Sequence, residues 1–136
     1  MKATELMVGD WVYYKGKEQM PCRITAILGK SAKFDNGTPQ DWLTDIDNFT
    51  PIPLTPEILE KNGFTVFLDF KDLVYYESDD KRIKATNSEG MKNTPNEWSI
   101  HIDTKDMSTM AYGEVTYVHE FQHLLRLCGI DKEVEI

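Results

Sequence analysis

The sequence predicts an α+β protein, and three observations point to this fold class. Short segments rich in β-branched and aromatic residues recur along the chain, with turn signals about every eight to twelve residues. A short segment after Leu54 carries the start and stop signals of a helix. Near the C-terminus, apolar residues follow the spacing of an amphipathic helix. We therefore expect a strand-rich first part and a second part that combines strands with helices.

Size and composition are those of a folded chain. The 136 residues suit one ordinary domain or two small subdomains. Hydrophobic residues make up 40% and charged residues 28%, which argues against disorder. The net charge of -8 repels phosphate backbones, so no nucleic-acid partner is expected. The basic cluster Lys81–Lys84 follows Asp79 and Asp80 and is interpreted as a hairpin end.

Cysteine usage and hydropathy predict a cytoplasmic protein without a membrane partner. Cys22 and Cys128 are far apart and outside any CxxC pattern, which favours two small buried residues over a disulfide or a zinc knuckle. The first residues lack the apolar run of a signal peptide. No segment approaches the roughly 20 apolar residues that span a bilayer.

The first part, residues 1–54, is expected to form a small curled β-sheet or an SH3-like partial barrel. Strand-forming residues fill Gly9–Tyr14 and Cys22–Leu28. The pair Asn36-Gly37 predicts a tight two-residue hairpin turn, because both positions accept positive φ.

A short central helix is expected next. Thr55 is suited to cap its start, and Pro56 takes the first helical position, where its missing N–H costs nothing. Gly63 is suited to end the helix in the left-handed conformation, with Phe64 folding back onto Leu59.

The second part, residues 55–136, is expected to continue as an antiparallel β-meander packed against the first. In Glu97–Asp103 apolar and polar residues alternate, which predicts one buried and one solvated face. A loop is expected at Ser88–Asn96, and the C-terminal helix is expected to lead into a short last strand, Lys132–Ile136. The remaining predicted strands are Phe64–Phe70, Asp72–Ser78 and Lys81–Ser88.

Residues 119–123, HEFQH, match the HExxH pattern of zinc metalloproteases. On a helix, His119 and His123 lie on one face and can both turn toward one metal ion. Zinc accepts such ligands and keeps a position for water, from which Glu120 could take a proton. The pattern therefore raises the hypothesis of a minimal zinc-dependent hydrolase.

A third protein ligand is hard to find for that hypothesis. A catalytic zinc needs three, and the chain has no histidine after His123. His101, on a polar strand face, and Glu133 remain as candidates to complete the shell. Nothing in the sequence resembles the second subdomain that a protease requires.

The helical pattern also gives the HEFQH run a structural role. His119, Gln122, His123 and Arg126 share one stripe, which we expect to face solvent. The opposite stripe is apolar and is expected to seal the protein, while Gly129 ends the helix. The preferred prediction is thus an amphipathic helix with no catalytic, cofactor-binding or metal-binding residue. The apolar stripe consists of Val118, Phe121, Leu124, Leu125 and Cys128.

Three stretches resemble a group of small uncharacterised proteins encoded in prophages and mobile elements of gut anaerobes. They are ELMVGDWVYYKGK near the start, PIPLTPEILEKNGF in the middle and YVHEFQHLLRLCGIDKEVEI at the end. In that group the last stretch often has glutamine in place of Glu120 and asparagine in place of His123. The resemblance implies a genomic setting and an incidental HExxH match; it implies no activity or cofactor.

The leading hypothesis is a non-enzymatic accessory protein of a phage or mobile element that acts by binding another protein. An acidic surface, several aromatics at strand positions and the lack of a coherent catalytic set favour it. The alternative is the zinc hydrolase, with His119, His123, Glu120 and either His101 or Glu133. A nucleic-acid-binding factor is disfavoured by the charge. The oligomeric state is left open. The aromatics in question are Trp11, Tyr13, Tyr14, Trp42, Tyr75 and Tyr76.

Overall fold

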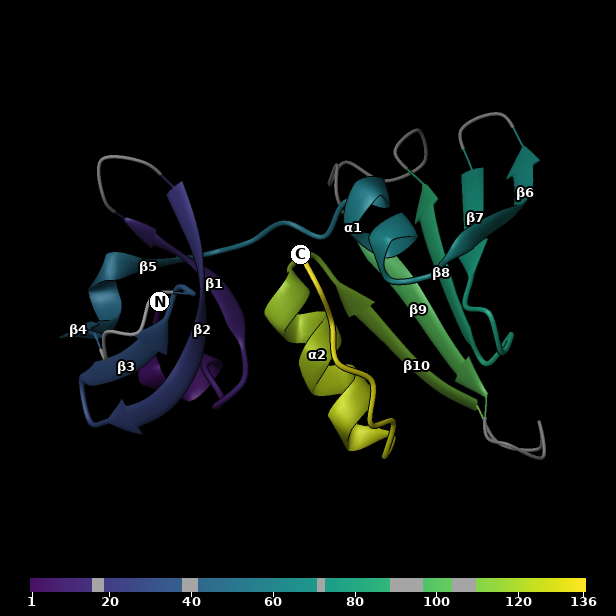
Figure 1. The fold of residues 1–136 in the computed structure, drawn as a ribbon. Helices are drawn as coiled ribbons and strands as arrows, with labels where there is room; N and C mark the ends of the chain where they lie inside the picture. Colours follow the sequence, from purple (N-terminus) through teal and green to yellow (C-terminus); the bar gives the residue numbers. More distant parts are fainter. Residues whose placement is uncertain (16–18, 38–41, 71–72, 89–96, 104–109) are drawn as a thin grey trace. The chain divides into compact units, whose positions relative to one another are not determined.

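The chain folds into two compact units, each built around one antiparallel sheet (Figure 1). Unit 1 comprises Met1–Ile52 and Tyr117–His123, and unit 2 comprises Pro53–Thr116 and Leu124–Ile136. The α+β class with two sheets and two α-helices thus agrees with the sequence. The computed structural model describes residues 1–15, 19–37, 42–70, 73–88, 97–103 and 110–136.

The division differs from the predicted boundary between residues 54 and 55. The first half of the C-terminal helix belongs to unit 1, whereas the sequence had assigned the whole helix to the second part. The physical reason is a set of long-range hydrogen bonds. One of them joins the backbone N–H of Val118 to the carbonyl of Ile52 at 2.8 Å.

Unit 1 contains a five-stranded sheet in the order β4-β3-β2-β1-β5, with every pair antiparallel. The strands predicted at Gly9–Tyr14 and Cys22–Leu28 are confirmed as β1 and β2. Short 3-10 turns occupy Ala3–Glu5 and Ile46–Asn48. The strands are β1 (Trp11–Lys15), β2 (Gln19–Leu28), β3 (Ser31–Asp35), β4 (Trp42–Asp45) and β5 (Phe49–Pro51).

The predicted two-residue turn at Asn36-Gly37 is wrong in length. Phe34 of β3 pairs with Trp42 of β4, so the connection is longer, and its residues 38–41 lie outside the described part of the chain. Gly37 does adopt positive φ (87°), and its N–H donates to Oδ1 of Asp35 at 2.7 Å. The buried core of the unit consists of Leu6, Val12, Cys22, Ile24, Ala32, Phe34, Ile46 and Phe49.

Unit 2 contains the predicted meander, a five-stranded antiparallel sheet in the order β10-β9-β8-β7-β6. The expected loop Ser88–Asn96 lies outside the described residues, apart from Ser88 at the end of β8. The second helix, α2, is the one shared by the two units. The elements are α1 (Pro56–Lys61), β6 (Thr65–Phe70), β7 (Leu73–Glu77), β8 (Ile83–Ser88), β9 (Trp98–Asp103), β10 (Met110–Val115) and α2 (Val118–Leu127).

Strand β9 confirms the predicted alternation. Trp98, Ile100 and Ile102 are buried, and the indole N–H of Trp98 donates to the carbonyl of Leu54 at 2.9 Å. Asp103, predicted on the solvated face, is buried instead, since its carboxylate lies beside Lys84.

Helix α1 forms as its sequence signals predict. The hydroxyl oxygen of Thr55 accepts from the N–H of Ile58, and Pro56 begins the helix. Gly63 has φ of 85°, and the N–H of Phe64 returns to the carbonyl of Leu59 at 3.0 Å. The cap and the Gly63 turn therefore fix both ends of a helix of only six residues.

The predicted last strand Lys132–Ile136 does not form. The backbone of Glu135 forms hydrogen bonds with the side chain of Asn62, where a strand would pair with another strand. The N–H of Glu135 donates to Oδ1 of Asn62 at 2.8 Å, and Nδ2 of Asn62 donates to the carbonyl of Glu135 at 2.7 Å. Lys61 also donates to the carbonyl of Ile136. An amide side chain thus holds the segment in place of a ladder.

The second half of α2 packs against β10 at a glycine. A Cβ built on Gly113 would lie 3.0 Å from Cδ2 of Leu124, tighter than nearly all real contacts. Gly113 pairs with Ile100 in the sheet, so the small residue lets the helix approach this face.

Replacing Gly113 with valine should destabilise the protein, because a branched side chain must displace Leu124. Overpacking of this kind costs about 1–3 kcal/mol of unfolding free energy. Chemical denaturation followed by circular dichroism measures the change. Ser99→Val, on the other face of the neighbouring strand, is the matched control and should stay within about 0.5 kcal/mol. Equal effects of the two variants would contradict close packing at Gly113.

Candidate functional site

The HEFQH run lies in α2, and its glutamate caps the start of the helix. Oε1 of Glu120 accepts a hydrogen bond from the backbone N–H of Tyr117 at 3.0 Å. This is the reach-back contact of a capping box, and a carboxylate in the first turn also stabilises the positive end of the helix dipole. The residue that the zinc hypothesis assigns as general base therefore has a structural role here.

Gln122 forms hydrogen bonds that join α2 to the backbone at the entry of β1. Its Oε1 accepts from the backbone N–H of Trp11, and its Nε2 donates to the carbonyl of Gly9, both at 3.0 Å. Gly9 lies in the turn that leads into β1, with φ of 95°. The amide of Gln122 satisfies one backbone group in this turn and one at the start of the strand.

His123 pairs with a buried carboxylate in the same turn. Its Nε2 lies 2.8 Å from Oδ2 of Asp10, which also accepts from the backbone N–H of Met7 at 2.8 Å. The Asp10 side chain is fully buried, whereas 24% of the His123 side chain is exposed. A buried carboxylate needs such partners, since an unpaired one would be costly. The helix thus supplies a hydrogen bond that Asp10 requires.

His119 is buried to the same extent as Gln122. Its ring stacks on Tyr117 with centroids 5.9 Å apart and lies edge-on to His123 at 5.6 Å. Nδ1 has no hydrogen-bond partner among the described residues. Burial lowers the pKa of His119 below its ordinary value of 6.5, although the nearby Asp10 and Glu120 carboxylates act in the opposite direction. Burial therefore favours the neutral form of the ring.

The prediction that the histidine stripe faces solvent is wrong. His119 and Gln122 are each only 6% exposed, and His123 is half-buried. The stripe is polar because it meets polar groups, namely Asp10 and the backbone around it. The apolar stripe is buried at Val118, Phe121 and Leu125 as predicted, whereas Leu124 and Cys128 are half-buried.

The proposed zinc ligands are distributed over both units. His101 lies on β9 in unit 2, where its ring contacts Tyr112 at 4.9 Å, and Glu133 is exposed after α2. Among the residues that the structure describes, no three His, Cys, Asp or Glu side chains gather in a metal-binding arrangement.

Asp10 is the site residue that sequence reasoning missed. It lies 113 positions from its partner His123, and no local pattern signals a pairing over that distance. The only hint was an acidic residue directly after Gly9 at the entry of a predicted strand.

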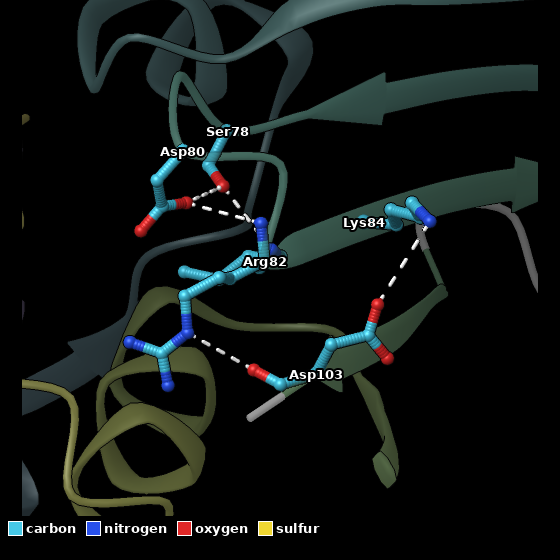
Figure 2. Close-up of polar contacts among 6 residues, drawn as sticks. Ser78, Asp80, Arg82, Lys84 and Asp103 are labelled. Atoms are coloured by element: carbon cyan, nitrogen blue, oxygen red, sulfur yellow. Dashed lines mark hydrogen bonds and ion pairs between the residues drawn. The ribbon is translucent and has the colours of Figure 1, made fainter. Parts of the chain in front are cut away.

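A second polar cluster lies at the turn between β7 and β8 in unit 2 (Figure 2). Oδ1 of Asp80 accepts from the Ser78 hydroxyl at 2.6 Å and from the N–H of Arg82 at 3.1 Å. The Ser78 hydrogen bond is the main reason that the pKa of Asp80 is lowered. Arg82 in turn donates from Nε to the carbonyl of Asp103 at 3.0 Å, and Lys84 lies 3.9 Å from the Asp103 carboxylate. The predicted hairpin end at Lys81–Lys84 is thereby confirmed.

A pocket of about 570 Å³ adjoins this cluster and includes residues after α2. Charges of both signs line it, so it defines no site for a ligand of one charge. The cluster's hydrogen bonds tie the β7–β8 turn to the end of β9, which is a structural role. The charged residues that line the pocket are Asp79, Asp80, Arg82, Asp131, Lys132 and Glu133.

Strand β6 lies at one edge of the unit 2 sheet (Figure 1). It carries three consecutive exposed apolar side chains. Val66, Phe67 and Leu68 are 48%, 44% and 48% exposed. The register shifts between Val66 and Leu68, and the Phe67 ring lies edge-on to Tyr75 at 5.6 Å. Three consecutive exposed apolar residues on an edge strand are unusual, because such edges invite association.

Carboxylates lie near this strand. Desolvation raises the pKa of Tyr76, which pairs with Val66, and Glu60, Glu57 and Asp69 raise it further. The carboxylates of Glu57, Glu60 and Asp69 therefore all raise the pKa of Tyr76, on the strand next to β6.

Compared with known proteins, the chain matches no protein-family model, no curated protein and no solved structure. Within the described residues, none of the helices has the length and apolar character needed to cross a membrane.

Acid should destabilise the protein through His119. The unfolded state binds this proton near pH 6.5 and the folded state only at lower pH, so stability is full above 6.5 and falls as the pH drops below it. His119→Phe keeps an aromatic ring against Tyr117 and removes the proton site. Melting curves between about pH 5 and pH 8 should show a shallower acid loss for this variant than for the wild type. Tyr117→Phe is the control and should retain the wild-type slope; a slope unchanged in His119→Phe would contradict the assignment.

Gln122→Leu should cost about 1–3 kcal/mol of unfolding free energy, because it removes the hydrogen bonds to the part-buried Trp11 N–H and Gly9 carbonyl. Urea denaturation measures the loss. Leu127→Gln, at a position 84% exposed on the same helix, should have little effect. A Gln122→Leu variant as stable as the wild type would show that these two hydrogen bonds are dispensable.

Proposed function

We propose that this chain is a non-enzymatic protein that binds another protein along strand β6. The observation that carries the proposal is the apolar row Val66-Phe67-Leu68 on an edge strand. An edge strand offers backbone N–H and C=O groups to an incoming strand, and exposed side chains add selectivity.

The bulge at Phe67 bears on the kind of association. Bulges interrupt the regular edge and are one way in which proteins discourage indiscriminate edge-to-edge pairing. An irregular apolar edge favours a partner whose side chains and register match it. The bulge therefore supports recognition of a specific partner over non-specific association.

The residues of the HEFQH run lend no support to the zinc hydrolase alternative. Glu120 caps the helix, Gln122 bonds the backbone near β1, and His123 bonds Asp10. Each polar residue after His119 thus has a structural explanation that needs no metal.

Two finer predictions belong to the same proposal. An SH3-like arrangement of unit 1 is supported by the strand order β4-β3-β2-β1-β5, by the long β2 with its bulge after Ile24, and by the 3-10 turn before β5. A role as a cytoplasmic accessory protein of a phage or mobile element is supported by the resemblance of the three sequence stretches.

Selection of peptides from a random display library tests whether β6 binds protein chains. We expect wild-type protein to enrich a set of related peptides, and Phe67→Lys with Leu68→Lys to abolish their binding, because buried contact with apolar side chains is lost. Trp42→Lys with Leu43→Lys, at the exposed edge strand β4 of unit 1, is the matched control and should retain binding. Failure to enrich any peptide, or enrichment that survives the β6 changes, would contradict the proposal.

A further inference from the structure

One face of the unit 2 sheet keeps contact with solvent across all five of its strands. The other face is the buried one, where Trp98 and Ile100 join the core and Gly113 approaches Leu124 of α2. Side chains of the first face, called here the open face, are all half-buried or exposed. In register from β10 to β6 they form two rows, Tyr112-His101-Lys84-Glu77-Thr65 and Glu114-Ser99-Thr86-Tyr75-Leu68.

Tyr112 presents an aromatic ring at the β10 end of the open face, and neighbouring side chains hold it in place. The side chain is 56% exposed. Its hydroxyl donates to Oε1 of Glu114 at 3.0 Å and lies 3.3 Å from Oγ of Ser99. The ring of His101 lies edge-on to it, with centroids 4.9 Å apart. Because these contacts orient the ring before a ligand arrives, binding has less disorder to remove.

Tyr75 presents a second aromatic ring toward the other end of the open face. It is half-buried, and the ring of Phe67 lies edge-on to it with centroids 5.6 Å apart. Strand β7, which carries Tyr75, lies three strands away from β10, which carries Tyr112. At the usual strand spacing this separation is about 15 Å. A ligand that meets both tyrosines must therefore be an extended chain, longer than a single ring.

The groups between the two tyrosines are suited to hydroxyl-rich ligands. Ser99 and Thr86 pair with each other in the sheet, and each hydroxyl can both donate and accept a hydrogen bond. Glu77, in the other row, adds an acceptor. A sugar ring has faces lined by C–H groups, which pack on the electron-rich face of an aromatic ring, and a rim of hydroxyls. Aromatic rings at both ends with hydroxyl and carboxylate groups between them therefore match a saccharide chain.

The charges of the open face favour a neutral chain over an anionic one. Glu77 and Glu114 each carry a negative charge, whereas the ammonium of Lys84 lies 3.9 Å from the carboxylate of Asp103. A single-stranded nucleic acid could stack its bases on the same rings, but its phosphates would meet these carboxylates and a net charge of -8. Chains of uronic acids would meet the same repulsion.

We infer that the open face is a binding site for a neutral, extended oligosaccharide, with Tyr112 and Tyr75 stacking on different sugar rings of one chain. The site is additional to the protein-binding edge proposed for β6 and does not depend on it. Its ligand lies across the strands, whereas a protein segment at β6 would lie along the edge.

Isothermal titration calorimetry with defined oligosaccharides tests the inference. The neutral probes are cellohexaose, xylohexaose, mannohexaose and chitohexaose, and hexagalacturonic acid is the anionic comparison. We expect the wild type to bind at least one neutral probe and not the anionic one. Tyr112→Ala and Tyr75→Ala should each weaken the binding by about 2- to 10-fold, because each removes one stacking ring. The two losses should multiply in the double variant, since the rings lie far apart.

Trp42→Ala is the matched control, because it removes a ring that is 42% exposed on the sheet of unit 1, and it should retain the wild-type affinity. Circular dichroism checks that all variants are folded. Binding to none of the neutral probes, or binding unchanged in both tyrosine variants, would overturn the inference. A loss confined to one tyrosine would show that one chain does not span the face, and would also overturn it. Library peptides whose binding Tyr112→Ala abolishes would assign the open face to a protein instead.

Discussion

The buried carboxylate of Asp10 is the constraint on which unit 1 depends. A fully buried charge must find hydrogen-bond donors, and Asp10 finds them in the backbone of Met7 and in the ring of His123. This ties the entry of β1 to the first half of α2, at opposite ends of the sequence. Gln122 strengthens the same junction by pairing with the backbone on both sides of Asp10. Hydrogen bonds to Asp10 and to the backbone of Gly9 and Trp11 therefore join the first half of α2 to unit 1.

The sequence predicts an element correctly where residues close together in the chain determine its structure. Helix α1 is an example, since its Thr55 cap and its Gly63 turn act within a few residues and fix both ends. The burial of Trp98, Ile100 and Ile102 is another, because alternation on one strand states which face meets the core. The C-terminal segment is the opposite case: it has the composition of a strand, but the Asn62 side chain supplies its partners.

The orientation of α2 could not be read from its periodicity. A helical repeat separates a polar stripe from an apolar stripe, but it does not tell whether the polar one meets water or a polar surface of the same protein. Here the deciding partners are a carboxylate and two backbone groups more than a hundred residues away. A single sequence contains no pattern that signals pairings over such separations. The prediction that His119 and Gln122 face solvent is wrong for this reason.

The HExxH pattern can arise from requirements that have nothing to do with a metal. Glu120 accepts from the N–H of Tyr117, the residue before the helix, and Phe121 is buried. Gln122 bonds the backbone of Gly9 and Trp11, and His123 bonds the buried carboxylate of Asp10. Only the buried Nδ1 of His119 is left without a partner among the described residues. Glu120, Gln122 and His123 each bond a different neighbour, and the neighbours of Gln122 and His123 lie more than a hundred residues away in the sequence. Strand β6 is a described region that these structural demands do not explain, because three consecutive apolar side chains are exposed there at the edge of a sheet.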